Sequence, residues 1–416
     1  MSKSLLVNYG TLGFADNTTS YQALSGLIGN STTTENRKEM PIREAGVFSN
    51  LFTYVSSNTT LVSSTITLKK SLVASSVQVT YTSGQTGIKE DITNTSTFAA
   101  TDEGDYRISV NNDVSGAKIL TVTLIGIQFE PTNSAKCFTT MGRTNQSTIA
   151  TVANTLYDFI NNGQGADTNE AILKYRVRSS FTASNLYVFI SANTKDVDIN
   201  FRTRVNGANG NQIITYTSTQ TGAKEDITNT DTLSAGDDFN FERDHTTSTG
   251  GTTATLQNVS VTLIGTSNIF PLVAGEGNVE AIAFNSTVYV GISSGLAEPV
   301  TTEAFTQMYP RFDFTAKELS AYVTTNTIIT LGTPVTLRDN GADSSLTVSY
   351  GIAETGLKSD ITNSATITSG SDEINYSIVT PNTAGSISFT WVGMLGETAA
   401  SVFDIPFRRR RIRKFF

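Results

Sequence analysis

Apolar and polar residues alternate along short stretches in three separate parts of the chain. Residues 120–124, 259–263 and 387–391 each carry an apolar side chain at every second position, with threonine or serine between. Because successive side chains of a strand point to opposite faces, this period of two predicts an antiparallel strand with one face in a core and one in water. No stretch combines a sustained period of 3.6 residues with capping residues, so we expect no long helix.

The alternating stretches belong to a longer internal repeat. The nine-residue motif Thr-Gly-x-Lys-x-Asp-Ile-Thr-Asn occurs three times and is identical at seven of its nine positions. Its aspartates, Asp91, Asp226 and Asp360, are separated by 135 and 134 residues. Solenoid repeats run only about 20–50 residues, so a repeat of this length is a domain.

Matching residues extend over most of each copy. Residues 48–59 match residues 181–194 and 314–327. A glutamate and an arginine recur further upstream, as Glu35 with Arg43, Glu170 with Arg178, and Glu303 with Arg311. Strand-like runs number roughly eight per copy, as in a β-sandwich or jelly roll. We therefore predict an all-β chain with three tandem β-sandwich, jelly-roll-like domains at residues 1–131, 132–268 and 269–405, and a basic C-terminal tail at residues 406–416.

Turn residues predict one hairpin in each copy. Residues 206–211 and 339–343 contain Asn-Gly pairs between two strand-like runs, as hairpin connections do. The first copy has the sequence Ser-Leu-Val-Ala-Ser-Ser at residues 71–76 in this place. We therefore expect its hairpin to differ from the other two.

The motif carboxylates have a structural and a functional interpretation. Aspartate and asparagine side chains accept hydrogen bonds from the backbone two residues on, which fixes a turn. Three copies of one turn explain the recurrence without any ligand. A Ca²⁺ site at an acidic turn such as residues 102–105 is the alternative, but the EF-hand spacing is absent. We interpret the following residues as a structural turn motif and expect no metal or other cofactor: Asp91, Asn94, Asp226, Asn229, Asp360 and Asn363.

The chain offers few residues for catalysis. His245 is the only histidine and Cys137 the only cysteine, and they lie more than a hundred residues apart. A catalytic histidine would need a nucleophile and a buried acid beside it, whereas His245 follows Asp244 at the start of a Thr/Ser/Gly-rich loop, where a solvated side chain is expected. A four-ligand Cys/His zinc site is excluded. We expect a protein that is not an enzyme.

Composition adds an expectation about where the protein is made. The hydrophobic fraction is 38%, charged residues make up 16%, and a single cysteine allows no intrachain disulfide. The N-terminal residues lack an apolar stretch of signal-peptide length. No apolar run approaches the ~18 residues of a membrane-spanning helix. We expect synthesis in the cytoplasm, no secretion and no membrane contact.

The C-terminal residues differ from the rest of the chain. Residues 407–416 carry six of the 29 basic residues, which leaves 23 basic against 37 acidic residues elsewhere, a formal charge of −14. The tail could neutralise nucleic acid, serve as a targeting sequence, or anchor the protein to an acidic partner. An acidic body repels a polyanion, and terminal phenylalanines suit apolar pockets, so we favour the anchor. Its expected contact residues are Arg408, Arg409, Arg410, Arg411, Ile412, Arg413, Lys414, Phe415 and Phe416.

The motif, the turn at residues 206–210 and the Gly-Asp pairs that precede the next strand resemble repeats of bacteriophage virion proteins. These are β-sandwich or jelly-roll modules of head decoration proteins, head fibres, and tail or receptor-binding proteins. The resemblance implies a structural, non-enzymatic component of the virion, held by its tail to other virion proteins. It also implies a homo-oligomer, and it carries over no catalytic residue. It leaves open which part of the virion, which host and which oligomeric state.

The alternative is a carbohydrate- or receptor-binding module, because sandwich folds often bind glycans on loops or faces. Such a protein would contact host-surface glycans through clustered aromatic side chains. Here most tyrosines and phenylalanines lie within alternating strands. The only tryptophan, Trp391, is in register with Leu124 and Leu263, which predicts a larger ring in the same core position and not a ligand-stacking residue. The structural role is therefore favoured.

Overall fold

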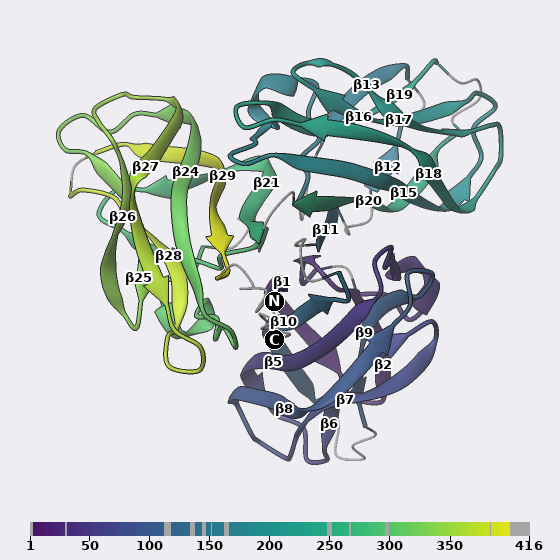
Figure 1. Cartoon of the computed structure of the whole chain (residues 1–416), viewed down its shortest axis with the longest axis horizontal. Coiled ribbons are helices and arrows are strands. Elements are labelled where there is room, and N and C mark those ends of the chain that lie inside the picture. The colour runs from purple at the N-terminus through teal and green to yellow at the C-terminus, as the bar shows by residue number, and fades with distance from the viewer. Residues whose placement is uncertain are drawn as a thin grey trace, which may run out of the picture.

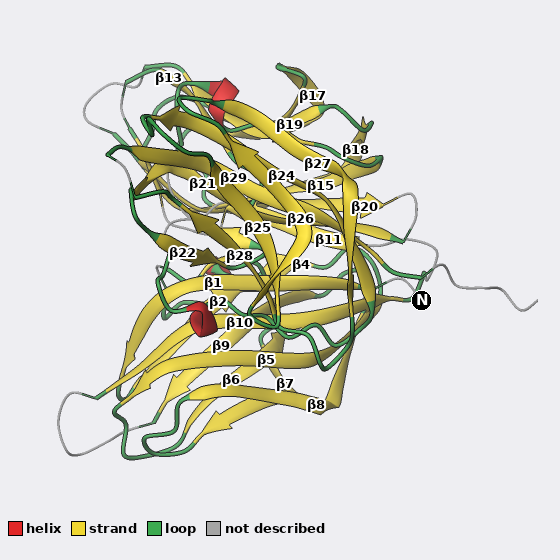
Figure 2. Ribbon diagram, turned by 90° about the vertical axis from the view of Figure 1, so that its left-hand side faces the viewer, coloured by secondary structure: helices red, strands yellow, loops and turns green. Residues whose placement is uncertain are grey.

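The computed structural model consists of β-strands and three single-turn 3-10 helices, as Figure 2 shows. It describes residues 3–29, 31–111, 118–133, 138–143, 147–150, 152–161, 166–247, 252–265, 268–295, 299–382 and 384–399. The 3-10 helices are η1 (Glu35–Arg37), η2 (Glu170–Ile172) and η3 (Glu303–Phe305). The prediction of an all-β chain without long helices is confirmed within these residues.

The first copy forms a sandwich of two sheets. One sheet has the order β3-β1-β10-β5-β8 and the other β2-β9-β6-β7, with β4 paired to β9. Numbered along the chain, the eight longer strands described here have the orders 1-8-3-6 and 2-7-4-5, which is the jelly-roll topology. The strands are β1 (Ser4–Ala15), β2 (Thr18–Ala23), β3 (Gly26–Leu27), β4 (Met40–Pro41), β5 (Gly46–Asn58), β6 (Ser64–Lys70), β7 (Val73–Tyr81), β8 (Gly87–Phe98), β9 (Glu103–Val110) and β10 (Ile119–Pro131).

The second copy repeats this topology. Its sheets are β11-β20-β15-β18, with β12 also on β20, and β13-β19-β16-β17, with β14 on β19. Among the described strands, the pairings of the first copy therefore recur, except for the pairing of β1 with the short strand β3. The strands are β11 (Phe138–Arg143), β12 (Ser147–Ile149), β13 (Asn154–Asp158), β14 (Tyr175–Arg176), β15 (Phe181–Asn193), β16 (Ile199–Val205), β17 (Ala208–Tyr216), β18 (Gly222–Leu233), β19 (Asp238–His245) and β20 (Ala254–Gly265).

The third copy has the same two sheets, β23-β21-β29-β24-β27 and β22-β28-β25-β26. Its strands are β21 (Ile269–Ala283), β22 (Thr287–Val290), β23 (Ser294–Gly295), β24 (Phe314–Asn326), β25 (Thr333–Asp339), β26 (Ala342–Tyr350), β27 (Gly356–Ile367), β28 (Ile374–Val379) and β29 (Ser386–Glu397). The motif strands β8, β18 and β27 thus occupy one equivalent edge in all three jelly rolls. We call the three units the first, second and third domain.

The hairpin of the first copy corrects a prediction. Ser71 and Leu72 form the same two-residue connection as Asn206 and Gly207, and both have positive φ, 44° and 69°. The strand register imposes this turn, because Lys70 pairs with Val73 on either side of it. The predicted difference in hairpin is wrong, and the unusual sequence instead places a leucine in the left-handed region, at a cost of order 1–3 kcal/mol.

The three domains are arranged around a common centre, which Figure 1 shows as a ring. Strands β1, β11 and β21, with the short strands β3 and β23, meet there. The interior of the first domain is a separate apolar cluster that includes Leu6 and Phe48. The other face of its inner sheet, including Leu5 and Leu124, joins a second cluster that also contains the interiors of the other two domains. The domains are therefore joined by apolar packing.

This packing corrects the expectation that one face of the alternating strands lies in water. Thr123, Thr262 and Thr390 alternate with apolar residues, so the pattern predicts them on the solvent-facing side of their strands. All three are at most 1% exposed. In a strand that is covered on both faces, the polar and the apolar positions of an alternating pattern are both buried. Neighbouring domains cover the second face, which the sequence pattern of a single copy does not reveal.

Candidate functional site

The motif lies within the edge strand of each domain, where the strand register shifts at a bulge, and its aspartate ties the two sheets together. In the first domain the Asp91 carboxylate accepts hydrogen bonds from the backbone N–H groups of Thr93 (3.2 Å) and Asn94 (3.0 Å). Its other oxygen accepts from the N–H of Gln78 on β7, at 2.9 Å. Because β7 belongs to the opposite sheet, this carboxylate joins the two edges of the sandwich. Asp226 and Asp360 make the equivalent contacts, to Thr228, Asn229 and Ile213, and to Thr362, Asn363 and Thr347.

These contacts stabilise the charged form of the carboxylate. Burial alone would raise the pKa of Asp226, but hydrogen bonds from Asn229, Ile213 and Thr228 outweigh it and lower the pKa to about 2. The pKa of Asp360 is likewise about 2. A carboxyl group with a depressed pKa in the folded state stabilises the fold above its ordinary pKa, and this contribution is lost as the pH falls through the folded value.

We predict that Asp226→Ala lowers the free energy of unfolding at neutral pH by about 0.5–2 kcal/mol, as for a lost capping carboxylate. The difference from the unsubstituted chain should shrink between the ordinary pKa of 3.8 and about 2. Denaturant titrations at neutral and acidic pH measure both. Asp226→Asn, which keeps one acceptor oxygen, is the control and should cost less. Equal stability of Asp226→Ala and the unsubstituted chain would remove the structural role.

The recurring arginines join each domain to the next. At the first junction, between the first and second domains, Arg43 Nε donates to Glu225 Oε1 at 2.9 Å. At the third junction, which closes the ring from the third domain to the first, Arg311 Nε donates to Glu90 Oε1 at 2.9 Å. A second guanidinium nitrogen binds the other carboxylate oxygen in both pairs. Both glutamates are the fifth residue of the motif, so the motif also serves the junctions.

The second junction, between the second and third domains, departs from this scheme. The fifth motif residue there is Ser359, and Arg178 donates to the hydroxyl oxygens of Ser359 and Ser320. No carboxylate among the described residues pairs with Arg178. Burial lowers the pKa of its guanidinium, and the charge of Glu318 in the third domain offsets only part of this effect. The second junction therefore lacks the paired charges of the other two.

Apolar and amide contacts hold the second junction instead. Trp391 of β29 stacks on Phe159 of the second domain, with ring centroids 6.3 Å apart, and meets the edge of Tyr175 at 5.7 Å. The buried Asn161 side chain donates to the carbonyl of Val273 at 2.7 Å. Trp391 is only 1% exposed. The prediction that it fills a core position is correct as to burial, but the two aromatic rings that it contacts, Phe159 and Tyr175, belong to the second domain.

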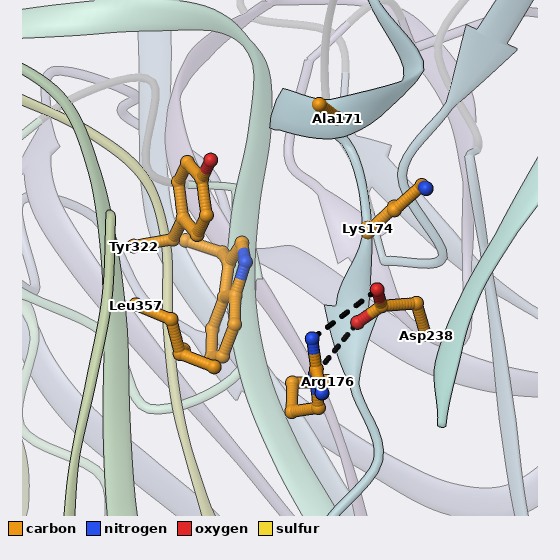
Figure 3. A pocket seen from close by; sticks show the side chains of 7 residues that line it. Ala171, Lys174, Arg176, Asp238, Tyr322 and Leu357 are labelled. Carbon is orange, nitrogen blue, oxygen red and sulfur yellow. Dashed lines mark hydrogen bonds and ion pairs between the residues drawn. The ribbon is translucent and has the colours of Figure 1, made fainter. Parts of the chain in front are cut away.

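A cavity of about 220 Å³ lies beside this contact. Figure 3 shows Tyr322 and Leu357 of the third domain on one side, with Lys174, Arg176 and Asp238 of the second domain on the other. Arg176 Nε lies 2.7 Å from Asp238 Oδ1. Lys174 makes no ion pair with any described residue. The cavity thus has an apolar wall facing a charged wall that carries two cations and one carboxylate.

The other candidate groups from the sequence are the histidine, the cysteine and the basic tail. His245 is the last residue of β19 and is 4% exposed, so the expectation of a solvated loop histidine is wrong. Its register opposite Ile199 and Asn154, between two strands, buries it, and burial lowers its pKa. Cys137 and the tail residues 406–416 lie outside the described residues.

The junction arginines carried a signal in the sequence. Arg43, Arg178 and Arg311 recur at matched positions, and Ser359 stands at one of the two variable motif positions. Neither observation could be assigned a role from the sequence, because a ligand site, an ion pair within one domain and a contact between domains all predict the same recurrence. Within the described part of the chain, no group of three or more His, Cys, Asp or Glu side chains is placed to hold a metal ion, and no helix is long and apolar enough to span a membrane.

Comparisons with known proteins give distant similarity only. No family model matches the chain, and no match was found among curated proteins. A solved chain from the triple jelly roll fold and turret assembly of an archaeal virus is 12% identical, with 95% of this chain and 91% of that chain covered and a TM-score of 0.18. A chain of Sulfolobus turreted icosahedral virus is 11% identical, with 86% and 81% covered and a TM-score of 0.16. TM-scores this low carry no argument, so the jelly-roll assignment rests on strand order.

Proposed function

We propose that this chain is a non-enzymatic structural protein of a bacteriophage virion, a surface component such as a capsid decoration protein or head fibre. The observation that carries the proposal is the closed ring, in which one repeated motif both builds each jelly roll and receives an arginine from the preceding domain. The recurring arginines and their partners hold neighbouring domains together at these contacts. A rigid block with three near-equivalent sides is suited to a symmetric assembly.

Exposed apolar side chains at matched positions of the three domains support this role. The isoleucine after each motif aspartate is exposed, by 62% at Ile92, 67% at Ile227 and 68% at Ile361. A single exposed isoleucine is ordinary on a protein surface. The same exposure at the same position in three domains gives three matched apolar points around the ring. Such points suit contacts with neighbouring subunits in a particle.

The tail provides the attachment in this proposal. Its arginines can pair with carboxylates in a bidentate manner. Its apolar residues can each contribute about 1.5–3 kcal/mol if fully buried in a partner. The last residue that the structure describes is Ala399. The partner proposed here is another virion protein with an acidic, apolar-lined surface.

The test is incorporation into particles. Deleting residues 407–416 should abolish recovery of the chain with purified virions, while its circular dichroism and thermal unfolding stay unchanged because the three jelly rolls are intact. Full incorporation of the truncated chain would contradict the anchor. Replacing Phe415 and Phe416 together by alanine separates the two contributions, since loss on truncation but not in this double variant would leave charge alone as the cause. Absence of the full-length chain from purified particles would contradict the virion role itself.

A further inference from the structure

The second junction differs in charge from the other two at equivalent positions. Strand pairing fixes the equivalence, because Arg176 lies opposite Asp238 as Pro41 lies opposite Glu103. In the third domain Tyr309 bonds Glu373 in the same place. These two paired positions are extended to a set of five. The set adds the residue two positions before Arg176 or its equivalent, the residue two positions after it, and the fifth motif residue of the neighbouring domain. The sets are Glu39, Pro41, Arg43, Glu103 and Glu225 at the first junction; Lys174, Arg176, Arg178, Asp238 and Ser359 at the second; and Gln307, Tyr309, Arg311, Glu373 and Glu90 at the third.

These sets have opposite net charge. One cation and three carboxylates give −2 at the first junction, and one cation and two carboxylates give −1 at the third. Three cations and one carboxylate give +2 at the second. The whole chain has a formal charge of −8, so a positive junction runs against its general composition. Asp238 pairs with Arg176, and the charge of Glu318 in the third domain acts on Arg178, whereas Lys174 has no ion pair among the described residues.

The second junction is also the one with aromatic cavity walls. Trp391 replaces the leucines found in register at residues 124 and 263. Its ring is held by Phe159 and Tyr175, so it forms a fixed wall. The cavity of about 220 Å³ is smaller than the roughly 300–1,000 Å³ of sites for drug-sized molecules. It therefore suits a ligand about the size of one sugar ring.

We propose that this cavity binds a monosaccharide acid, a single sugar ring that carries one carboxylate. Arg176 and Lys174 attract the carboxylate, and the flexible stem of Lys174 lets its ammonium group turn toward the ligand. Tyr322 and Leu357, which are half-buried, cover the apolar face of the ring, and Trp391 supports this wall from behind. A single ligand charge balances the two cations and one carboxylate that line the cavity. This site is independent of the tail and of the attachment proposed above.

The experiment uses the full chain and three probes: D-glucuronate, D-glucose and acetate. Calorimetric titration should detect binding of glucuronate. Glucose and acetate should bind at least about tenfold more weakly, because glucose lacks the carboxylate and acetate lacks the sugar ring. Lys174→Gln and Arg176→Tyr introduce residues that the third domain carries at these positions, and each should weaken glucuronate binding at least about tenfold. Lys317→Gln, a lysine change away from the cavity, is the matched control and should leave binding unchanged.

A further variant protects the test from misfolding. Ser359→Glu restores the residue of the first and second domains and gives Arg178 a carboxylate partner, so it should preserve the fold. It also lowers the net charge of the second junction by one, so it should weaken glucuronate binding. No glucuronate binding up to about 10 mM would overturn the proposal. Equal binding of acetate and glucuronate would overturn the assignment of a sugar acid. Binding that survives both Lys174→Gln and Ser359→Glu would place the ligand elsewhere and overturn it as well.

Discussion

Replacing Arg311 by alanine should open the ring at the third junction. The side chains of Arg311 and Glu90 are only 21% and 19% exposed. Two nitrogens of the guanidinium bind the two carboxylate oxygens. Removing one member leaves the other partly buried without its counter-charge, which typically costs about 2–4 kcal/mol. Phe305 packs on Tyr54 at the same junction, with ring centroids 5.5 Å apart, and should also loosen.

Small-angle scattering and denaturant unfolding measure this effect. Arg311→Ala should increase the radius of gyration, because the first and third domains have no direct peptide connection and the remaining strand and apolar contacts at the centre must hold them alone. The free energy of unfolding should fall, and the unfolding curve should broaden as the domains lose cooperativity. Lys317→Ala, which breaks the more exposed pair of Lys317 with Glu397 inside the third domain, is the control and should cost at most about 1 kcal/mol. An Arg311→Ala chain as compact and stable as this control would refute closure by the arginine.

Replacing Asp105 by asparagine should stabilise the first domain at neutral pH. Asp105 is 1% exposed on β9, and neither carboxylate oxygen has a hydrogen-bond partner among the described residues. Burial, with the like charges of Glu35 and Glu39, raises its pKa to about 9, while Lys69 and Arg107 offset only part of this. The second and third domains have Asn240 and Asn375 at the equivalent place, each opposite an arginine as Asp105 is opposite Lys69.

The sign of the pH effect follows from proton binding. The folded chain keeps a proton on Asp105 between the ordinary pKa of 3.8 and about 9, where the unfolded chain has lost it. Stability must therefore fall as the pH rises through this window. Asp105→Asn should raise the free energy of unfolding at neutral pH by about 1–3 kcal/mol and flatten the decline. Some decline should remain, because the pKa of Glu39 is also raised, to about 7.

Denaturant titrations at acidic, neutral and alkaline pH test this prediction. The reverse change, Asn240→Asp in the second domain, is the matched control and should lower stability increasingly with pH. A constant difference between Asp105→Asn and the unsubstituted chain across this range would show that the carboxyl group does not titrate as described. A loss of stability at neutral pH would show that the aspartate has a favourable partner.

The sequence predicted what depends on local pattern and repetition. The alternation at residues 120–124 and its two counterparts identified strands, and the recurrence of the motif identified three similar units. Two-residue hairpins follow from Asn-Gly pairs, but the first copy reaches the same turn with Ser71 and Leu72. That hairpin was missed because strand register overrode the local preference of the turn residues.

The junctions could not be predicted because their partners are distant in sequence. Arg43 and Glu225 are 182 residues apart, and Arg311 and Glu90 are 221 apart. The repeat shows that these residues recur, but not whether an arginine pairs within its own copy or with the next one. Trp391 illustrates the same limit, because its burial was predictable from register while its partners in the second domain were not.

The covalent order of the three domains changes how the ring forms. Three separate single-domain chains would associate by collisions and would dissociate on dilution. Here the third junction closes within one molecule, at an effective concentration that short connections typically bring to the millimolar range, about 10⁻³ M. A contact between Arg311 and Glu90 that would be too weak to join separate chains is then sufficient to keep the ring closed, whatever the protein concentration. Linkage also lets Ser359 differ from Glu90 and Glu225, so that one side of a nearly symmetric ring can specialise without altering the other two.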